Sequence, residues 1–294
     1  LPEGHVFRFV NEENPSMQAA AAARRECSGD SLYPVGAVLV RDGQVLARAG
    51  NGFNRGPGEV HICPRIVQNC PTGVGYELCH LHDPPGHAEP MLMGIAKEAG
   101  IDTAGADVYL YGHWWCCEPC WKTMIDAGIK DVYLLENASE IFSRERVYAE
   151  TLKSSIKSVY IIGSLTNLGD QRDVQKKFYE WLGEVCESID CKTCIPHRDN
   201  RENMHVKDPK EVYQWATQCV KDADAIIAEV SIPSFGAGGE LVVAAYEKKP
   251  IVLLSKKGSA VSRFVRGNPS VVYHIEYETQ EEAGVMLKNV LKQL

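Results

Sequence analysis

One stretch of the sequence decides the fold of the second half of the chain: Ser158-Val159-Tyr160-Ile161-Ile162-Gly163-Ser164. Its first five residues are mostly apolar, which is typical of a strand that is buried on both faces of a parallel sheet. A glycine and a serine follow directly, as they do where such a strand turns toward a helix. We therefore expect a doubly wound α/β domain to begin at this strand.

Helical and apolar segments continue to alternate after this strand. Helices are expected over residues 172–184, 209–221, 239–248 and 281–294, and strands over residues 225–230 and 251–254. Short apolar strands between helices are typical of a buried parallel sheet with helices on both faces. We therefore predict a Rossmann-like second domain over residues 155–294 and a separate first domain over residues 1–154.

The first domain has a different order of elements. A helix is expected over residues 17–27, a hairpin over 35–49, helices over 87–99 and 117–127, and strands over 107–111 and 131–135. The hairpin is indicated by Asp42-Gly43 between two apolar runs. Each domain is long enough to bury a core of its own, so the chain is predicted to be an α/β protein of two domains.

The composition excludes several classes of function. The 294 residues carry a net charge of -8 with a pI near 5.6, whereas a polynucleotide partner normally requires a basic surface. No apolar run approaches the roughly 20 residues that cross a bilayer, and residues 1–5 lack the features of a signal peptide. We therefore expect a cytoplasmic protein with no membrane or polynucleotide partner. In that compartment the 11 cysteines are expected as reduced thiols and zinc ligands.

Two short motifs in the first domain have the spacing of a catalytic zinc site. His87-Ala88-Glu89 is followed by Cys117-Glu118-Pro119-Cys120, and both motifs fall at predicted helix starts. One imidazole and two thiolates leave a fourth zinc position open for water, and Glu89 stays free to move protons. This order of histidine, glutamate and CxxC is the signature of zinc deaminases. A redox CxxC or a structural zinc site, with His87 an ordinary loop residue, is the alternative, and the upstream His-x-Glu argues against it.

The first domain resembles the deoxycytidylate (dCMP) deaminase branch of the cytidine deaminase family over residues 14–135. The resemblance rests on the two zinc motifs together with Val35-Gly36-Ala37-Val38, Asn51-Gly52-Phe53-Asn54 and Ala127-Gly128-Ile129. It implies an α/β/α sandwich around a mixed five-stranded sheet, zinc on His87, Cys117 and Cys120, catalysis by Glu89, and a sugar or phosphate contact from Asn54. The chain departs from the family at Cys116, where proline is usual, and over residues 112–115, so the base that is bound is less well defined than the metal.

A second group of metal-ligand residue types lies in the stretch before His87. The candidate ligands of a second, structural zinc are Cys63, Cys70, Cys79 and His82, with His80, His113 and Cys116 as further candidates. Some deoxycytidylate deaminases carry a second zinc, so the resemblance allows one. Reduced thiols beside solvated histidines fit the irregular spacing equally well. In the second domain, Cys191-x-x-Cys194 has no partner pair nearby, and we interpret it as two loop thiols.

The second domain contains a carboxylate where N-glycosidic chemistry requires one. Pro233-Ser234-Phe235-Gly236-Ala237-Gly238-Gly239-Glu240 follows an apolar strand, and Glu240 is expected at the end of a glycine loop, on the first turn of a helix. Cleavage of an N-glycosidic bond needs a carboxylate against the anomeric carbon, as a nucleophile or as a stabiliser of positive charge. The N–H groups of the loop and the Ser234 hydroxyl are suited to a phosphate. The plain alternative is a glutamate that only stabilises a helix N-terminus.

Residues 158–294 resemble the 2'-deoxynucleoside 5'-phosphate N-hydrolases, which belong with the nucleoside 2-deoxyribosyltransferases. The resemblance rests on the stretches 158–164, 223–230, 233–241 and 262–267. It implies that Glu240 is catalytic, that Ser262 reaches a phosphate in the neighbouring subunit of a homodimer, and that substrate is bound by Tyr160, Gly163, Ser164, His197, Ser234, Gly236 and Gly238. Ala216 stands where the family has an aspartate that works beside the glutamate, and Thr166 where it has a phosphate-binding arginine.

Together the two domains predict a bifunctional enzyme that acts on a small pyrimidine nucleotide. The first domain would deaminate dCMP, or a 5-substituted dCMP, to the uracil form, and the second would release the base from deoxyribose 5-phosphate. The alternative is a deaminase whose second domain binds nucleotide for regulation or oligomerisation, because Ala216 and Thr166 depart from the hydrolase pattern.

Overall fold

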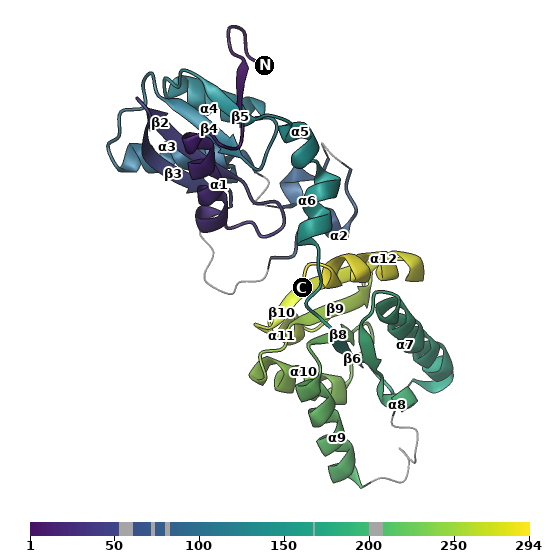
Figure 1. Ribbon diagram of the computed structural model, residues 1–294. Helices are drawn as coiled ribbons and strands as arrows, with labels where there is room; N and C mark the ends of the chain where they lie inside the picture. Colours follow the sequence, from purple (N-terminus) through teal and green to yellow (C-terminus); the bar gives the residue numbers. More distant parts are fainter. Residues whose placement is uncertain (53–60, 72–73, 80–82, 167, 200–207) are drawn as a thin grey trace. The chain divides into compact units, whose positions relative to one another are not determined.

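The computed structural model describes residues 1–52, 61–71, 74–79, 83–166, 168–199 and 208–294. The internal contacts divide the chain into two compact units (Figure 1). Unit 1 contains Leu1–His61 and Pro71–Lys153, and unit 2 contains Ile62–Cys70 and Ser154–Leu294. Each unit is built on one five-stranded sheet. Among the described residues, no helix has the length and apolar character that a bilayer crossing requires.

Unit 1 has a mixed sheet in the strand order β1-β5-β4-β2-β3. β1, β5 and β4 run parallel, and β2 is antiparallel to both β4 and β3. The strands are β1 Phe7–Val10, β2 Gly36–Arg41, β3 Gln44–Gly50, β4 Asp107–Tyr111 and β5 Val132–Leu135. The helices are α1 Pro15–Cys27, α3 Ala88–Glu98, α4 Glu118–Asp126, α5 Ala138–Ile141 and α6 Arg144–Thr151, with short turns η1 Tyr76–Leu78 and η3 Pro84–Gly86.

Helices cover both faces of the unit 1 sheet. Successive strand residues point to opposite faces, so Leu39 and Val38 of β2 enter different core clusters. Leu39 packs with Leu92 of α3 and Met124 of α4, whereas Val38 packs with Met17 of α1. The predicted α/β/α sandwich is confirmed, and α3 and α4, which carry the two zinc motifs, share one face.

Unit 2 has an all-parallel sheet in the order β10-β9-β8-β6-β7. The strands are β6 Ser158–Ile162, β7 Lys192–Cys194, β8 Ala225–Glu229, β9 Ile251–Lys256 and β10 Val271–Tyr277. The helices are α2 Pro64–Val67, α7 Arg172–Glu187, α8 Pro196–Asp199, α9 Pro209–Asp222, α10 Phe235–Tyr246, α11 Arg263–Arg266 and α12 Gln280–Leu291, with a turn η4 Gly169–Gln171.

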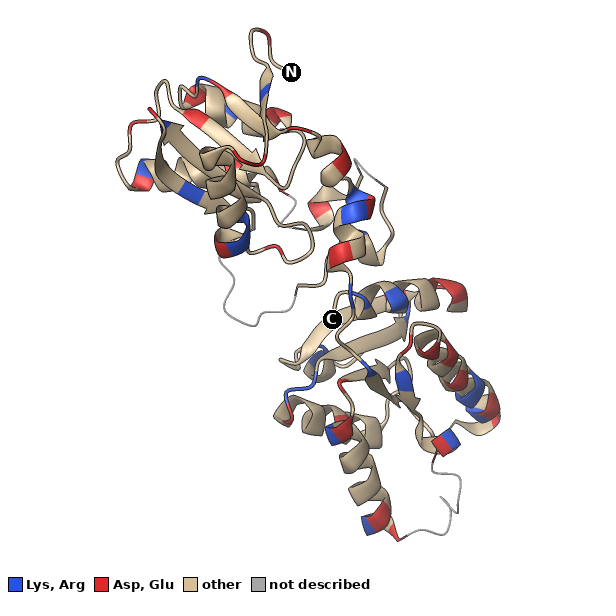
Figure 2. Ribbon diagram, viewed as in Figure 1, with Lys and Arg blue, Asp and Glu red and all other residues tan. Residues whose placement is uncertain are grey.

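Two core clusters lie on the two faces of the unit 2 sheet. Ile161 of β6 packs with Leu182 of α7 and Leu287 of α12. Tyr160, one residue earlier, packs on the other face with Leu241 of α10. α7 carries acidic and basic residues in mixture along its length (Figure 2) and buries Tyr179, Leu182 and Val185, as expected of a helix that buries one face only. The predicted doubly wound fold is confirmed.

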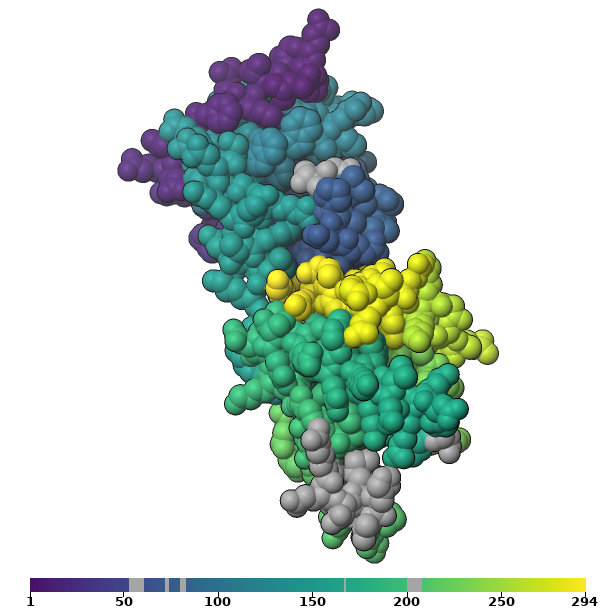
Figure 3. Space-filling view, turned by 90° about the vertical axis from the view of Figure 1, so that its right-hand side faces the viewer, coloured from purple at the N-terminus to yellow at the C-terminus, as the bar shows by residue number. Residues whose placement is uncertain are grey.

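The segment Ile62–Cys70 packs in unit 2, although the residues before and after it in the sequence belong to unit 1. Val67 is fully buried in the same cluster as α7 and α12. The Cys63 N–H donates to Gln293 Oε1 at 2.7 Å, and Asn289 Nδ2 donates to the Val67 carbonyl at 3.3 Å. In Figure 3 this segment, drawn in blue, lies beside the yellow α12. The segment therefore completes a core that is otherwise made by residues after position 153.

Some elements differ from the predicted ones. The strands β1, β7 and β10 were not predicted from the sequence. Cys194 ends β7 and so does not lie in a loop, which corrects one part of the loop-thiol interpretation. The helix predicted from residue 239 begins instead at Phe235, because the Ser234 Oγ accepts the Ala237 N–H at 3.3 Å and caps it there. The glycine-rich stretch is thus the first turn of α10.

Candidate active sites

Three side chains of unit 1 come together as a set of metal ligands. His87 precedes α3, Cys117 precedes α4, and Cys120 lies on the first turn of α4. The His87 Nδ1 atom is 3.3 Å from Cys120 Sγ and 3.5 Å from Cys117 Sγ, and the two sulfurs are 3.2 Å apart. One imidazole nitrogen and two thiolates at helix N-termini are suited to a zinc ion that keeps a fourth position open.

The two cysteines of this group differ in how readily they lose a proton. The hydrogen bond with Cys120 and a second one with His87 lower the pKa of Cys117 to about 4, although burial opposes the shift. The same hydrogen bond and burial raise the pKa of Cys120, so the shared proton stays on that sulfur. A cation bound to the two sulfurs would favour the thiolate form of both cysteines.

Glu89 lies beside the three ligands but is not one of them. It is on the first turn of α3 and its side chain is buried. The thiol of Cys116 hydrogen bonds Glu89, and burial with that carboxylate nearby raises the pKa of the thiol well above its ordinary value. Burial also lowers the pKa of His113, whose Nδ1 accepts the Trp115 N–H at 3.1 Å. Two of the residues that depart from the deaminase pattern, Cys116 and His113, thus lie near the carboxylate.

One buried side chain positions the zinc motif in a way that the sequence analysis missed. The Oδ1 atom of Asn51 accepts the Val35 N–H at 2.7 Å, and its carboxamide is buried. The next residue, Gly52, donates its N–H to the Gly86 carbonyl at 2.7 Å, directly before His87. The end of β3 is therefore fixed against the turn that carries the histidine. Asn51 was quoted as part of a motif, and its position at a strand end was the available signal.

In unit 2 a buried tyrosine holds the predicted catalytic carboxylate. The hydroxyl of Tyr160, on β6, donates to Glu240 Oε1 at 2.8 Å. Glu240 lies in the second turn of α10, not the first as predicted, because that helix begins at Phe235. Burial raises the pKa of Glu240 to about 6, and the Tyr160 hydrogen bond opposes the shift. A carboxyl group with this pKa is mostly ionised at neutral pH but sits in an apolar setting.

The edge of the sheet beside this pair is open at the start of α10. β6 lies between β7 and β8, so the chain leaves β6 in one direction and returns on its other side, which is where such sheets bind ligands. A side chain added at Gly238 would meet nothing within 4 Å, and one at Gly236 would meet only the Ser234 Oγ at 3.8 Å. There is thus free space beside Gly236 and Gly238 on the first turn of α10, while the Ala237 and Gly238 N–H groups donate to Ser234.

Gly163 and Ser164 follow β6 at the same edge. A side chain at Gly163 would come within 2.2 Å of the Tyr179 ring, so only glycine fits there. The Tyr179 hydroxyl donates to the Ser164 carbonyl at 3.1 Å, and the Ser164 hydroxyl donates to the Thr166 carbonyl at 3.2 Å. The turn after β6 is thus held in place by the Tyr179 ring and by these two hydrogen bonds.

Known proteins are similar to each of the two halves of the chain. Residues 10–136 match the family model of the cytidine and deoxycytidylate deaminase zinc-binding region. A protein of Syntrophotalea carbinolica, assigned the name 2'-deoxynucleoside 5'-phosphate N-hydrolase 1, is 33% identical over 122 residues, which are 39% of this chain and 85% of that protein. A protein of Methanosarcina mazei with the same assigned name is 28% identical over 128 residues, 43% of this chain and 78% of that protein. The chain is a fusion of these two families.

Solved structures include a further similar protein. Clostridium botulinum CMP N-glycosidase, BcmB, is 21% identical, with 45% of this chain and 97% of that chain covered at a TM-score of 0.35. The two families in the fusion both hydrolyse C–N bonds, so this deaminase and N-hydrolase fusion is an enzyme of that class.

Two predicted substrate residues of unit 2 lie on elements other than those that carry Tyr160 and Glu240. His197, on α8, has its Nε2 atom 3.2 Å from Glu180 Oε1 of α7, and burial lowers its pKa. The ring of His197 is 6.2 Å from that of Tyr179, which belongs to the α7 side of the sheet. Ser262 directly precedes α11. Asn54 and His82 are outside the residues that the structure describes.

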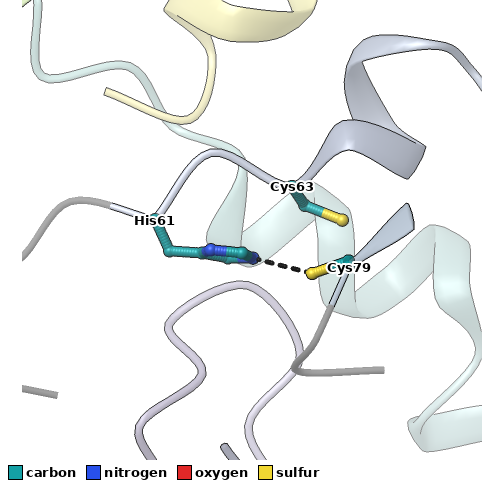
Figure 4. Close-up of side chains that lie close together, drawn as sticks. All are labelled: His61, Cys63 and Cys79. Atoms are coloured by element: carbon teal, nitrogen blue, oxygen red, sulfur yellow. Dashed lines mark hydrogen bonds between the residues drawn. The ribbon is translucent and has the colours of Figure 1, made fainter. Parts of the chain in front are cut away.

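The second cysteine group of the fusion contains a ligand that the sequence analysis did not name. His61, Cys63 and Cys79 have their ligand atoms within 4.8 Å of one another (Figure 4). The His61 Nε2 atom is 3.3 Å from Cys79 Sγ, and both cysteines are buried. Cys70 is not a member of this group. The His-x-Cys spacing of residues 61 and 63 was the signal that could have found His61.

A buried carboxylate at the end of β8 was also missed. Glu229 accepts hydrogen bonds from Ser231, from Tyr277 Oη at 3.3 Å and from Gln175 Nε2 at 2.9 Å, and burial raises its pKa. The Ser231 Oγ in turn accepts the Lys256 N–H at 2.8 Å. This network fixes the start of the segment that leads from β8 to α10. Glu229 therefore has a structural role distinct from that of Glu240.

Proposed function

We propose that the chain is a bifunctional pyrimidine nucleotide enzyme, which deaminates dCMP or a 5-substituted dCMP and then hydrolyses the N-glycosidic bond of the product. One observation carries the proposal: a set of groups for each step occurs in one chain. The first set is His87, Cys117 and Cys120 with Glu89, and the second is Tyr160 with Glu240. The two activities are assigned to domains over residues 1–154 and 155–294, with the segment 62–70 packed into unit 2.

The deamination step is assigned to unit 1. A zinc ion on His87, Cys117 and Cys120 would supply an activated water for attack on C4 of the cytosine ring. Glu89 takes the proton that this water loses and delivers it to the departing amine, which leaves as ammonia. Glu89 lies on the first turn of α3, directly after the His87 N-cap, so its carboxylate would be close to a metal held by that histidine. Asn54 is assigned to the sugar or phosphate.

The glycosidic step is assigned to unit 2. Glu240 faces the positive charge that develops at the anomeric carbon while the base departs, and Tyr160 holds its carboxylate in place. The 5'-phosphate is assigned to the sheet edge and to the N-terminus of α10. The residues assigned to substrate there are Gly163, Ser164, His197, Ser234, Gly236 and Gly238.

Chromatography of all products from dCMP tests both assignments in one experiment. The purified chain should yield ammonia, uracil and deoxyribose 5-phosphate. Glu240→Gln should stop the sequence at dUMP with ammonia still released. Glu89→Gln should leave dCMP unchanged but still release uracil when dUMP is supplied. Failure of the intact chain to release ammonia from dCMP would overturn the first assignment, and failure to release base from dUMP would overturn the second.

A deaminase with a purely nucleotide-binding second unit is the alternative, favoured by Ala216 and Thr166. These residues replace the aspartate and arginine of the hydrolase pattern. In that case dUMP would bind unit 2 without loss of its base and would change the rate of ammonia release. Base release that depends on Glu240 would exclude this alternative.

A second zinc is proposed on His61, Cys63 and Cys79, with Cys70 and His82 as candidates for the fourth ligand. One imidazole and two buried thiols within 4.8 Å form a suitable donor set. Metal analysis should give two zinc ions per chain in the native protein and one in Cys79→Ser, with ammonia release retained if the protein stays folded. Two zinc ions in that variant, or one in the native chain, would contradict the proposal.

A homodimer formed through unit 2 is also proposed. The resemblance that places Ser262 near a neighbouring subunit supports it, and Phe235, Tyr246 and Phe264, which are 105%, 85% and 76% exposed on α10 and α11, are apolar side chains that such an interface would cover. Light scattering should show a dimer that Phe264→Ser with Phe235→Ser converts to a monomer. Val174→Ser is the matched control, because Val174 is 69% exposed on α7. A monomeric native chain would contradict the proposal.

A further inference from the structure

The two cysteines of the Cys191-x-x-Cys194 motif do not face each other. Cys191 is buried in the core cluster on the α7 side of the sheet. Cys194 packs against the cluster on the opposite side, with the residues of α9. In an extended strand, residues three apart point to opposite faces. The motif is therefore not a redox pair in itself.

Cys194 has a different thiol partner, which lies on α9. Its Sγ atom donates to the Cys219 Sγ at 3.3 Å. Both side chains are partly exposed, so small reagents in solution can reach them. The hydrogen bond from Cys194 lowers the pKa of Cys219, although burial and the charges of Asp222 and Glu240 oppose this shift. The pair thus places a thiol of lowered pKa beside a second thiol, the arrangement found in reactive cysteine pairs.

The thiol pair is connected to the proposed glycosidic site from two sides. Cys194 is the cross-strand neighbour of Tyr160 in the pairing of β7 with β6. Cys219 lies one helical turn after Trp215, whose ring meets the Tyr160 ring edge-on at 6.2 Å. Tyr160 is the residue that holds Glu240. A movement of α9 relative to β7 would therefore reach the carboxylate through Tyr160.

We propose that Cys194 and Cys219 form a reversible disulfide, and that the oxidised form of unit 2 binds dUMP less tightly and releases its base more slowly. With hydrogen peroxide as oxidant, the Cys219 thiolate attacks one peroxide oxygen, the O–O bond breaks, and the other oxygen leaves as water after taking a proton. The Cys194 sulfur then attacks the oxidised sulfur, the S–S bond forms, and the second oxygen leaves as water with the Cys194 proton. The two sulfurs lose two electrons and the peroxide gains them. A dithiol reverses the change by thiol exchange.

Closing this bond requires a movement within the site. The sulfurs lie 3.3 Å apart and must come to about 2.05 Å. β7 is held by its pairing with β6, so we expect the approach to draw α9 toward the strand and Trp215 with it. Displacements on the order of 1 Å at a reacting group cost about a hundredfold in rate. We expect base release from dUMP, and dUMP affinity, to fall about tenfold or more in the oxidised form.

The test uses the full chain with zinc bound, in reduced form and after treatment with hydrogen peroxide. Peptide mass mapping without reductant should show a Cys194–Cys219 link that dithiothreitol removes. The matched variants are Cys219→Ser, which should lose the link and the response to peroxide, and Cys191→Ser, which should keep both. A link through Cys191, or no link at position 219, would overturn the proposal.

The functional part of the inference rests on the proposed glycosidic activity, so two measurements are needed. Calorimetric affinity for dUMP reports on the site even where no base is released, and base release reports on turnover. Unchanged affinity and unchanged release in a mapped Cys194–Cys219 disulfide would overturn the switch. Absent base release in the reduced chain would count against the proposed function alone, because the disulfide and the affinity are still measured.

Discussion

At the scale of single residues, Glu240 lies between two opposing influences. Burial favours its neutral form, and the hydroxyl of Tyr160 favours its ionised form. The resulting pKa of about 6 predicts the pH dependence of base release. Below pH 6 the carboxyl group becomes protonated and cannot stabilise positive charge, so the rate should fall about tenfold for each pH unit. The measurement is the rate of uracil release from dUMP between pH 4 and 8.

Tyr160→Phe should move this acid limb to higher pH, because it removes the hydrogen bond that favours the carboxylate. Tyr179→Phe is the matched control, since Tyr179 is a buried tyrosine whose hydroxyl serves the Ser164 carbonyl. An acid limb that is the same in Tyr160→Phe and in the native chain would show that a different group controls the profile.

Glu89→Gln should abolish deamination and keep the metal. The amide has nearly the shape of the carboxylate but cannot carry a proton between water and the amine, so ammonia release should fall at least about a thousandfold. Zinc content should be unchanged, because Glu89 is not one of the three grouped ligands. Retained activity, or loss of zinc, would contradict the role assigned to this residue.

Ala216→Asp tests whether the missing aspartate limits the glycosidic step. Ala216 is on α9, one residue after the tryptophan that meets Tyr160. A carboxylate placed there should raise base release from dUMP about tenfold or more. Thr217→Asp is the matched control, because it adds the same charge at the next position of the helix, which points in a different direction. Equal effects of the two substitutions would indicate a general change in charge.

The individual metal ligands were predictable because they lie in short motifs with a characteristic spacing. His87, Cys117 and Cys120 were identified from two motifs, and the structure brings their ligand atoms together. Cys219 was not identified, because it reaches Cys194 only through folding, and His61 was overlooked although it stands two residues before Cys63. Tyr160 was named only through family resemblance, since nothing in its strand pattern reveals that its hydroxyl meets Glu240.

At the scale of elements, α10 carries the carboxylate and begins at a serine cap. Ser234→Ala should weaken the first turn by about 1 kcal/mol, since the Oγ accepts the Ala237 N–H. Thr279→Ala is the matched control, because its hydroxyl caps α12 in the same way at 3.1 Å. Hydrogen exchange should show each helix weakened by its own substitution. Only Ser234→Ala should raise KM for dUMP, and an unchanged KM would remove Ser234 from the phosphate site.

The long apolar helices and central strands were predictable, and the short elements at the edges were not. β6, β8 and β9 are continuous apolar runs with buried residues on both faces. β1 and β7 have only four and three residues at sheet edges, too short for a pattern to be recognised. The start of α10 was misplaced because glycines normally oppose a helix, and a single cap decides otherwise.

At the scale of the whole molecule, the two activities should be separable by metal removal. A chelator that extracts zinc should stop ammonia release from dCMP, because His87, Cys117 and Cys120 belong to unit 1. Base release from dUMP should continue, because the proposed glycosidic chemistry uses Tyr160 and Glu240 and requires no metal ion. Added zinc should restore ammonia release. Loss of both activities on chelation would show that unit 2 depends on the metal of unit 1.

The route of the chain also bears on how the protein is made. Residues 62–70 leave the ribosome early, yet the groups that they pack against, Asn289 and Gln293, are synthesised more than two hundred positions later. During synthesis Val67 therefore stays exposed to solvent until α12 has left the ribosome. Contacts between residues so far apart in the sequence slow folding, and the partly folded intermediates expose apolar surface that chaperones recognise. A chain of residues 155–294 alone would lack the segment 62–70, so the core surface that this segment covers would stay exposed.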